Sequence, residues 1–214
     1  MLVDKPGAAQ SVISLCLPGT YRTSPDYYPL LVMNSILGGQ FSSRLNMNLR
    51  EEKGYTYGAR STLEWRVHLP GPYVASAAVQ TAVTAQALEE SLKEYEGMRA
   101  ARPVTVEELQ FNKDYLTRGY PAGFETPGNV ATHLETLFRF RLSDDHFSEF
   151  IPRISAVSGE EVARVAKQYL DLAHVAAVIV GDRSKIERGL RALPIGKGLT
   201  VVQFDEDFRL VPAR

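Results

Sequence analysis

Arg50 and Tyr57 are the residues whose types and spacing best suit a chemical task in this 214-residue sequence. A guanidinium offers a rigid fork of donors for peptide carbonyl oxygens. A phenol can donate one hydrogen bond to the negative charge that builds on a tetrahedral intermediate. The two residues lie seven positions apart in the chain. Side by side, they would suit the gripping of a peptide while one of its bonds is cleaved.

Both residues also allow an ordinary structural interpretation. Arg50 lies beside Glu51 and would be a favourable cation at the C-terminal end of a helix. Tyr57 would share a strand face with Tyr55 and pack in the core. The spacing alone leaves both interpretations open.

The residues before Gly54 predict a helix. Ser42 or Ser43 is suited to the N-cap position, and Leu45 and Leu49 lie four residues apart on one helical face. The glycine follows where a helix would end. The guanidinium of the candidate pair is therefore predicted to lie in the last turn of this helix.

The chain then changes to a two-residue repeat. From Tyr55 to Arg66 the residues Tyr, Tyr, Ala, Ser, Leu and Trp alternate with Thr, Gly, Arg, Thr, Glu and Arg, which is typical of a half-buried strand. Tyr57 is predicted near the start of this strand, which folds back beside the helix.

Further elements are predicted along the rest of the chain. Strands are predicted at residues 10–17, 73–80, 174–180 and 200–204. Helices are predicted at residues 25–39 and 84–100, and three more begin near residues 106, 127 and 159. The last three starts rest on the capping boxes Thr105-x-x-Glu108 and Ser158-x-x-Glu161 and on Thr126-Pro127.

Closely joined strands followed by blocks of helices predict an α+β fold. We expect a two-layer sandwich, with a mainly antiparallel sheet and helices packed on one of its faces. The length fits a single domain over residues 1–192, with residues 193–214 as a C-terminal tail of the same domain.

The string LGGQFSSRLNMNLREEKGYTYGA at residues 37–59 resembles the second, non-zinc half of the pitrilysin/insulinase-type zinc metallopeptidases. These inverzincins include the mitochondrial processing peptidases and bacterial zinc proteases. Weaker matches are DKPGAAQSVI near the start, FETP at residues 124–127 and VAAVIVGD at residues 175–182. The resemblance implies two homologous halves that face each other as a clamshell, with the metal in only one half. It also implies that Arg50 and Tyr57 point into the chamber and bind substrate.

The histidines do not form the zinc site of this family. That site needs His-x-x-Glu-His, which places two imidazoles and a general base on one helical face. His68, His133, His146 and His174 are the four histidines, and none lies four residues from another. We expect no metal ligand and no catalytic residue in this chain, and the resemblance implies that zinc and the general base belong to the partner half.

Composition argues against several other classes of protein. A net charge of -1 and a pI of about 6.4 give no reason to expect nucleic acid or an anionic membrane as a partner. Cys16 is the single cysteine, so no disulfide can form within the chain. No apolar stretch is long enough to span a membrane, and no signal peptide is recognised.

The predicted function is thus the non-catalytic half of a zinc metallopeptidase. This half would close the chamber and grip an extended peptide, with a homologous His-x-x-Glu-His domain as partner in the same chain or in a separate subunit. Two alternatives stay open. One is a structural core subunit that kept the fold and lost any role in proteolysis, and the other is a peptide-binding module whose sheet edge adds a strand from the ligand.

Overall fold

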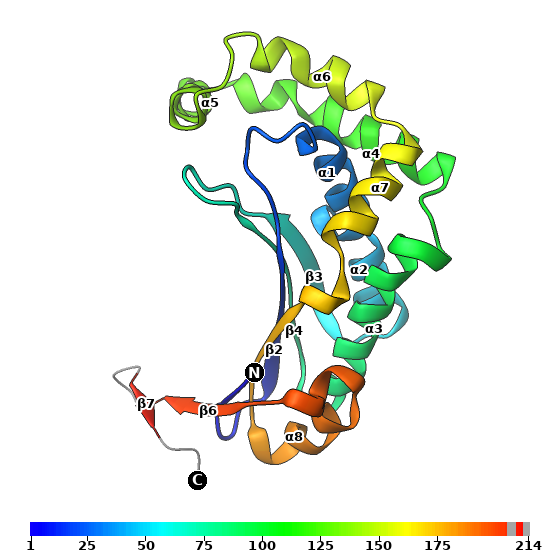
Figure 1. Ribbon diagram of the computed structural model, residues 1–214, viewed down its shortest axis with the longest axis vertical. Coiled ribbons are helices and arrows are strands. Elements are labelled where there is room, and N and C mark those ends of the chain that lie inside the picture. The colour runs from blue at the N-terminus through cyan, green and yellow to red at the C-terminus, as the bar shows by residue number, and fades with distance from the viewer. Residues whose placement is uncertain (205–208, 212–214) are drawn as a thin grey trace.

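The computed structural model describes residues 1–204 and 209–211 (Figure 1). Within these residues seven strands form one sheet, in the order β3-β4-β2-β5-β1-β6-β7. The strands are β1 (Leu2–Asp4), β2 (Gln10–Pro18), β3 (Thr56–Leu63), β4 (Pro72–Gln80), β5 (Ala176–Gly181), β6 (Val201–Phe204) and β7 (Leu210–Val211). Residues 205–208 and 212–214 of the predicted C-terminal tail lie outside the described residues.

The sheet is mixed, with antiparallel pairing dominant. Strand β4 pairs antiparallel with β3 and β2, β2 pairs antiparallel with β5, and β6 pairs antiparallel with β7. Strand β1 lies between β5 and β6 and is parallel to both. The closely joined strands predicted at residues 55–66 and 73–80 are therefore confirmed as the hairpin β3–β4, and the strand predicted at residues 200–204 is confirmed as β6.

Helices make up most of the remaining chain. The α-helices are α1 (Tyr27–Asn34), α2 (Arg44–Asn46), α3 (Thr84–Glu96), α4 (Val106–Gly119), α5 (Pro127–Phe140), α6 (His146–Ala156), α7 (Gly159–Tyr169) and α8 (Arg183–Ala192). Wider π-helical turns extend α1, α2 and α3, namely η1 (Ser35–Gly39), η2 (Met47–Glu52) and η4 (Gly97–Ala101). Short 3-10 helices are η3 (Thr81–Val83), η5 (Pro121–Phe124), η6 (Leu172–His174) and η7 (Pro194–Gly198).

Side-chain caps begin the helices where the sequence predicts them. Thr105 Oγ1 accepts a hydrogen bond from the Glu108 N–H at 3.2 Å, and Glu108 Oε2 accepts one from the Thr105 N–H at 3.1 Å. Ser158 and Glu161 form the same reciprocal pair at the start of α7. Ser43 precedes α2 as predicted, but its hydroxyl does not cap the helix. The capping boxes therefore supply partners for backbone N–H groups that a helix start leaves unpaired.

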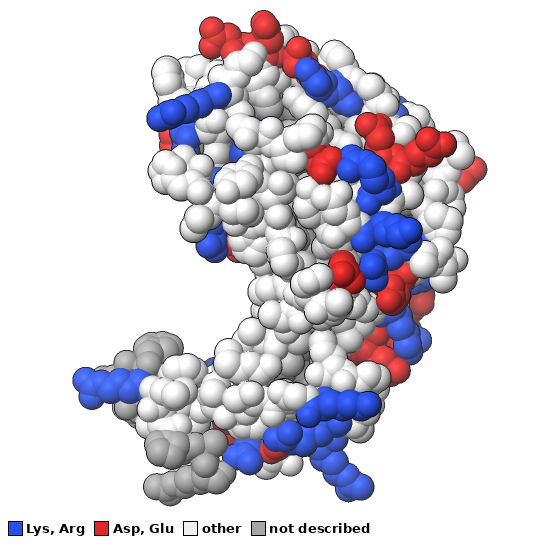
Figure 2. Space-filling model, in the orientation of Figure 1, with Lys and Arg blue, Asp and Glu red and all other residues white. Residues whose placement is uncertain are grey.

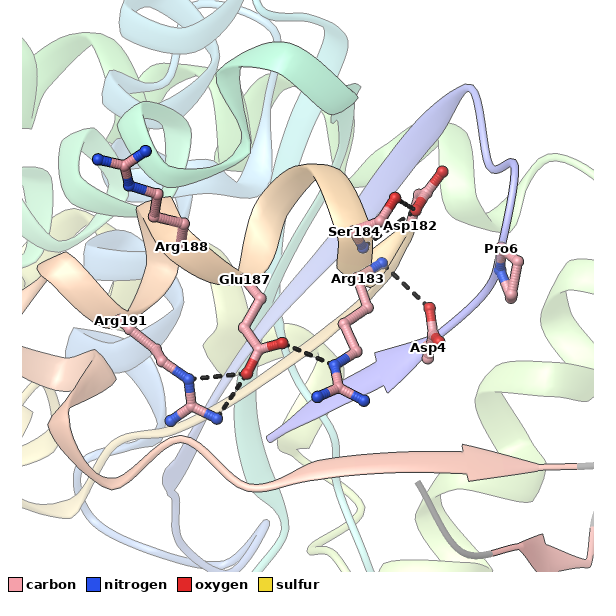
Figure 3. Close-up of a pocket in the computed structure, with 8 residues that line it drawn as sticks. All are labelled: Asp4, Pro6, Asp182, Arg183, Ser184, Glu187, Arg188 and Arg191. Carbon is pink, nitrogen blue, oxygen red and sulfur yellow. Dashed lines mark hydrogen bonds and ion pairs between the residues drawn. The ribbon is translucent and has the colours of Figure 1, made fainter. Parts of the chain in front are cut away.

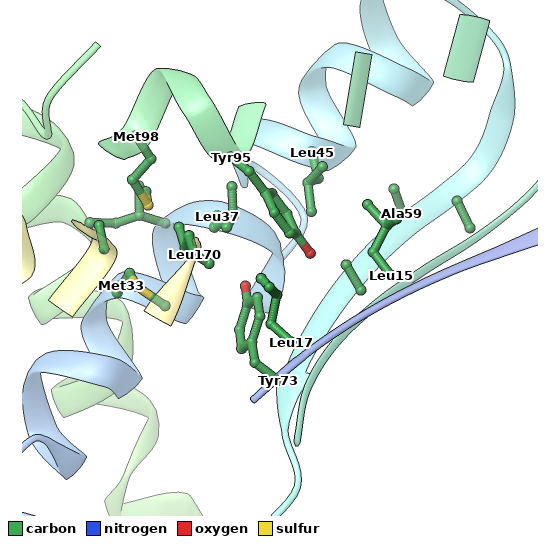
Figure 4. Packing of buried hydrophobic residues seen from close by; sticks show 14 of the residues in the cluster. Leu15, Leu17, Met33, Leu37, Leu45, Ala59, Tyr73, Tyr95, Met98 and Leu170 are labelled. Carbon is green, nitrogen blue, oxygen red and sulfur yellow. The ribbon is translucent and has the colours of Figure 1, made fainter. Parts of the chain in front are cut away.

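The helices cover one face of the sheet, and the core lies between these two layers (Figure 1). Along β2, the buried side chains of Ile13, Leu15 and Leu17 alternate with more exposed neighbours and face the helices. Figure 4 shows the rings of Tyr73 and Tyr95 meeting in this core, with centroids 6.2 Å apart. Burial of this continuous apolar layer is the main stabilising contribution to the fold.

The other face of the sheet carries no helical layer. It borders a hollow on one side of the molecule, which Figure 2 shows in the same orientation as Figure 1. The predicted α+β sandwich with helices on one face is therefore confirmed.

Three elements of the structure, β1, α6 and α8, are not predicted by the sequence. Strand β1 is only three residues long, too short for a two-residue repeat to be recognised. Helix α6 contains Pro152, which argues against a helix in any reading of local sequence. Helix α8 is not predicted because charged residues dominate it, with only Ile186 and Leu190 buried.

None of the described helices combines the length and apolar character that crossing a membrane requires.

Candidate functional site

The helix that carries Arg50 is anchored by its apolar face. Leu45 and Leu49 are both buried in the core, as their four-residue spacing predicts. Gly54 follows at φ +65, where its N–H donates to the Arg50 carbonyl at 3.1 Å. A left-handed residue at this point ends the helix and turns the chain toward β3. Arg50 thus lies in the last helical turn.

The guanidinium of Arg50 lies at the surface between two neighbours. Its side chain is 38% exposed, and Nε lies 3.3 Å from Glu51 Oε1. Its Cζ lies 4.7 Å from the ring centroid of Phe41, a residue that is itself 52% exposed. Exposed ion pairs and cation–π contacts each contribute at most about 1 kcal/mol. The guanidinium is therefore oriented by weak contacts that a ligand can readily replace.

A β-bulge at the start of β3 places Tyr57 on the open side of the sheet. Thr56 pairs with Val79 and Ala59 pairs with Ala77, so two residues of β3 oppose the single residue Ala78. In an unbroken strand Tyr57 would share the buried face of Ala59, but one extra residue shifts it to the face of Ala78. Tyr57 is accordingly 88% exposed. The alternative interpretation of Tyr57 as a core residue is wrong.

Asn46 connects the bulge to the loop that carries Phe41. Its Nδ2 donates to the Phe41 carbonyl at 2.7 Å, and its Oδ1 accepts from the Ala59 N–H at 3.1 Å. Only 4% of Asn46 is exposed. On the other flank of the bulge, Thr56 Oγ1 donates to the carbonyl of Ala78 on β4 at 2.6 Å. The bulge is therefore fixed by side-chain hydrogen bonds on both of its flanks.

A close approach between backbones holds η1 against β3. An added Cβ at Gly38 would lie 2.7 Å from the Ser61 N and 2.3 Å from its Oγ, so only glycine fits there. Ser61 Oγ also donates to Asn34 Oδ1 at 2.8 Å and accepts from the Tyr73 hydroxyl at 2.7 Å. The glycine pair before the helix therefore serves close packing as well as helix termination.

The structure places Arg50 and Tyr57 on adjacent elements without joining them directly. Helix η2 packs against β3, but no hydrogen bond, ion pair or ring contact links the two described side chains. Each side chain reaches the surface from its own element, Arg50 from η2 and Tyr57 from the bulge in β3. Sequence reasoning did not identify Asn46 and Phe41 as parts of this site. The spacing of Phe41 and Arg50 carries no recognisable signal, and the role of Asn46 depends on a residue 13 positions away.

The histidines lie on separate elements, and His133 and His146 both pack against the ring of Phe147. His133 stacks on Phe124 with ring centroids 4.2 Å apart, and His146 Nε2 lies 2.9 Å from Arg22 Nη2. His174 pairs with Asp171 at the surface. Among the described residues there is no cluster of three or more His, Cys, Asp or Glu side chains that could hold a metal ion. The residues present do not fit a zinc site, and we derive no zinc-dependent step in this chain.

A charged pocket lies at the start of α8 (Figure 3). Glu187 accepts hydrogen bonds from Arg183 Nε at 2.6 Å and from Arg191 Nε at 2.8 Å, and these two guanidinium groups lower the pKa of its carboxyl. The Arg183 N–H donates to Asp4 Oδ1 at 3.0 Å, which ties α8 to β1. The charged groups of Arg183, Glu187 and Arg191 in this pocket therefore pair with one another.

Comparison with known proteins shows the family of this chain. The family described as the peptidase M16 inactive domain matches residues 2–116, more than half of the chain. The chain belongs to this family. No curated protein matches the chain. The predicted resemblance to the non-zinc half of these peptidases is therefore confirmed.

Solved structures share the fold of this M16 inactive domain. A peptidase M16 inactive domain from Pseudomonas fluorescens is 22% identical, with a TM-score of 0.76 over 84% of this chain and 42% of that one. The inactive peptidase domain of a "putative zinc protease" from Bordetella parapertussis is 20% identical, with a TM-score of 0.69 over 82% and 94%. A chain of complex III from Candida albicans is 15% identical, with a TM-score of 0.73 over 88% and 48%. The present chain thus spans less than half the length of the Pseudomonas protein.

Proposed function

We propose that this M16 inactive domain is the substrate-gripping half of a two-part zinc peptidase. It closes a chamber together with a homologous domain that bears His-x-x-Glu-His, supplied in the same chain or by a separate subunit. That partner provides the zinc and the general base, and this chain contributes Arg50 and Tyr57 to the binding of an extended peptide.

The observation that carries this proposal is the bulge at Tyr57. A tyrosine that is 88% exposed on a strand gains nothing from hydrophobic burial, yet the bulge is fixed by the buried side chain of Asn46. A bulge next to a functional site commonly redirects one side chain. The phenol is thereby free to donate a hydrogen bond to a group outside this domain.

Arg50 complements this donor. Its guanidinium has one exposed carboxylate neighbour and one aromatic neighbour, and both contacts are weak. A fork of N–H donors in this state can bind peptide carbonyl oxygens in two-point fashion. The pair thus offers separate donors for binding the peptide and for stabilising charge on the carbonyl that reacts.

Strand addition at the edge of β3 is disfavoured by the structure. Strand β3 is the edge strand that carries Tyr57, so its outer edge is the place where a ligand strand would pair beside this residue. The Ala59 N–H donates to Asn46, and the backbone at Gly38 lies against Ser61. With these positions already covered, we favour binding through side chains over the addition of a strand.

A structural subunit is the second candidate function, and one comparison favours it. The Candida albicans neighbour is a chain of complex III, so the same fold occurs in a large assembly. In that case Arg50 and Tyr57 would have no ligand, and their substitution would leave any peptidase activity of the complex unchanged.

Kinetics of the reconstituted enzyme separates the two candidates. The domain is mixed at saturation with the His-x-x-Glu-His half from the same gene or its neighbour, and hydrolysis of an unfolded peptide is followed. Tyr57→Phe should lower kcat by about tenfold to a hundredfold, since one donor to developing charge is lost. Arg50→Ala should also raise KM, and Arg50→Lys should restore it only in part, because an ammonium lacks the fork.

The matched control is Tyr21→Phe, at an exposed tyrosine outside the proposed site. It should leave both kinetic constants at their wild-type values. If the Tyr57 and Arg50 variants also keep wild-type kcat and KM, the gripping role is wrong and the structural candidate is favoured.

A further inference from the structure

The open face of the sheet carries a row of small and branched apolar side chains that begins beside Tyr57. The pairing register connects its members in one line across the strands: Ala78 pairs with Val12, Val12 with Val180, Val180 with Val3, and Val3 with Val202. We call this set, Ala78, Val12, Val180, Val3 and Val202, the valine row. Because residues in register share a face, the row forms one continuous surface strip.

The bulge brings Tyr57 to one end of the valine row. Tyr57 and Gly58 lie opposite Ala78, its first member, on the face opposite the core. Five strand spacings separate β3 from β6 in the sheet order, which is about 24 Å, or the length of roughly seven extended residues. The proposed donor and the row therefore form a surface long enough for an extended peptide segment.

No charged residue interrupts the valine row. Val12, in the middle of the sheet, is 41% exposed, although a large apolar side chain at such a position is usually covered. Figure 2 shows that the middle of the hollow is uncharged, and the charged side chains gather elsewhere. The next row along the strands is polar where it starts, with Arg60 paired with Ser76 and Ser76 with Ser14.

We propose that the valine row binds the aliphatic side chains of an extended, uncharged peptide segment, and so selects the substrate. This proposal rests on the proposed function, because it places the aliphatic segment next to the substrate residue that Tyr57 would contact. A peptide that lies across the strands packs apolar side chains on the row. The hydroxyl groups of Ser76 and Ser14, in the adjacent row, are placed to bond the peptide backbone.

Selectivity follows from desolvation. A charged side chain laid on the valine row would leave water without gaining a partner, because no member of the row can form an ion pair or a strong hydrogen bond. An aliphatic side chain would instead bury apolar area on both sides of the contact. The row therefore discriminates between peptides by what it excludes as well as by what it binds.

Fluorescence anisotropy with the full chain tests the proposal. Two labelled peptides of equal length serve as probes: one rich in Val, Ala and Ser, and one in which Glu and Lys replace the aliphatic residues. The wild-type chain should bind the aliphatic peptide at least about tenfold more tightly. Val12→Glu should weaken this binding about tenfold, and Val12→Thr, which keeps the branched shape, should weaken it by a smaller factor.

Val106→Glu is the matched control. Val106 is exposed at the start of α4, on the layer of helices, so the same substitution there should leave binding unchanged. Circular dichroism confirms that each variant is folded. Equal affinity for the two peptides, no detectable binding, or equal effects of Val12→Glu and Val106→Glu would overturn the proposal.

Two further readouts separate the outcomes. If wild-type chain dimerises in sedimentation and Val12→Glu abolishes the dimer, the row is a contact between copies and the proposal is wrong. Tyr57→Phe is measured in the same peptide assay and should weaken binding far less than Val12→Glu. Wild-type kinetics for Tyr57→Phe, together with weaker binding for Val12→Glu, would reject the gripping role of Tyr57 and leave the valine row supported.

Discussion

Replacement of Asn46 by alanine tests how the bulge is held. The substitution removes the donor to the Phe41 carbonyl and the acceptor for the Ala59 N–H, whose bonds measure 2.7 and 3.1 Å. Asn46 is 4% exposed, so water cannot easily take its place. The buried Ala59 N–H and the partly buried Phe41 carbonyl lose their partner, at about 1–2 kcal/mol for the first and less for the second, and the free energy of unfolding should fall by roughly 1–3 kcal/mol.

Urea unfolding followed by circular dichroism measures this change. Asn129→Ala is the control, since Asn129 is exposed on α5 and its change should stay within about 0.5 kcal/mol. Asn46→Asp keeps the acceptor for Ala59 but loses the donor to Phe41, so it should be destabilising as well. An Asn46→Ala variant as stable as Asn129→Ala would refute the reasoning, because the two bonds would then contribute nothing to stability.

The same variant addresses activity. If Asn46 acts by positioning Tyr57, then Asn46→Ala should lower kcat of the reconstituted enzyme while the domain is still folded. Adding Tyr57→Phe to it should cost little more, because the two substitutions remove one interaction. Fully additive effects would show that Asn46 supports the fold without directing the phenol.

Two further predictions concern stability. Tyr57→Ala should change the free energy of unfolding by less than about 0.5 kcal/mol in thermal or urea unfolding, since the ring is exposed. Tyr73→Ala should lower it by about 3–5 kcal/mol, because that ring is buried in the core. Equal losses would contradict the assignment of Tyr57 to the open face. Burial, together with the nearby Arg22 guanidinium, lowers the pKa of His146 to about 4, below the value of 6.5 in an unfolded chain. The neutral imidazole therefore contributes fully to stability above pH 6.5, and this contribution is lost as the pH falls from 6.5 toward 4. Between pH 7.5 and 5 this loss should be roughly 1–2 kcal/mol in urea unfolding, and His146→Gln should show a correspondingly smaller change over the same range.

Local sequence signals predicted the helix starts and the buried faces well. Thr105 with Glu108 and Ser158 with Glu161 are only three residues apart, so the bonds that begin α4 and α7 depend on local sequence alone. The four-residue spacing of Leu45 and Leu49 was equally sufficient to place a helix on the core. Elements whose stability comes from distant partners were harder: β1 exists because β5 and β6 lie on either side of it.

The same distinction between local signals and distant partners applies to the candidate site. Arg50 was placed correctly because a glycine ends its helix four residues later. The environment of Tyr57 could not be read from alternation, which assigned it to the core. Its true position depends on the register between β3 and β4 and on a side chain from α2. The family resemblance anticipated an exposed tyrosine, while the periodicity of the residues did not.

The bulge allows one short strand both to bury its core side chains and to expose Tyr57. Ala59, Ser61 and Leu63 must face the helices for the sheet to bury its core, and strict alternation would bury Tyr57 with them. One extra residue turns Tyr57 to the open face and Thr56 toward the face of Val79, and leaves β3 from Ala59 onward in register with β4. The change is stable because the Ala59 N–H, which donates to Asn46, is not left without a partner. An exposed phenol is therefore obtained on the open face without any loss of core packing on the other.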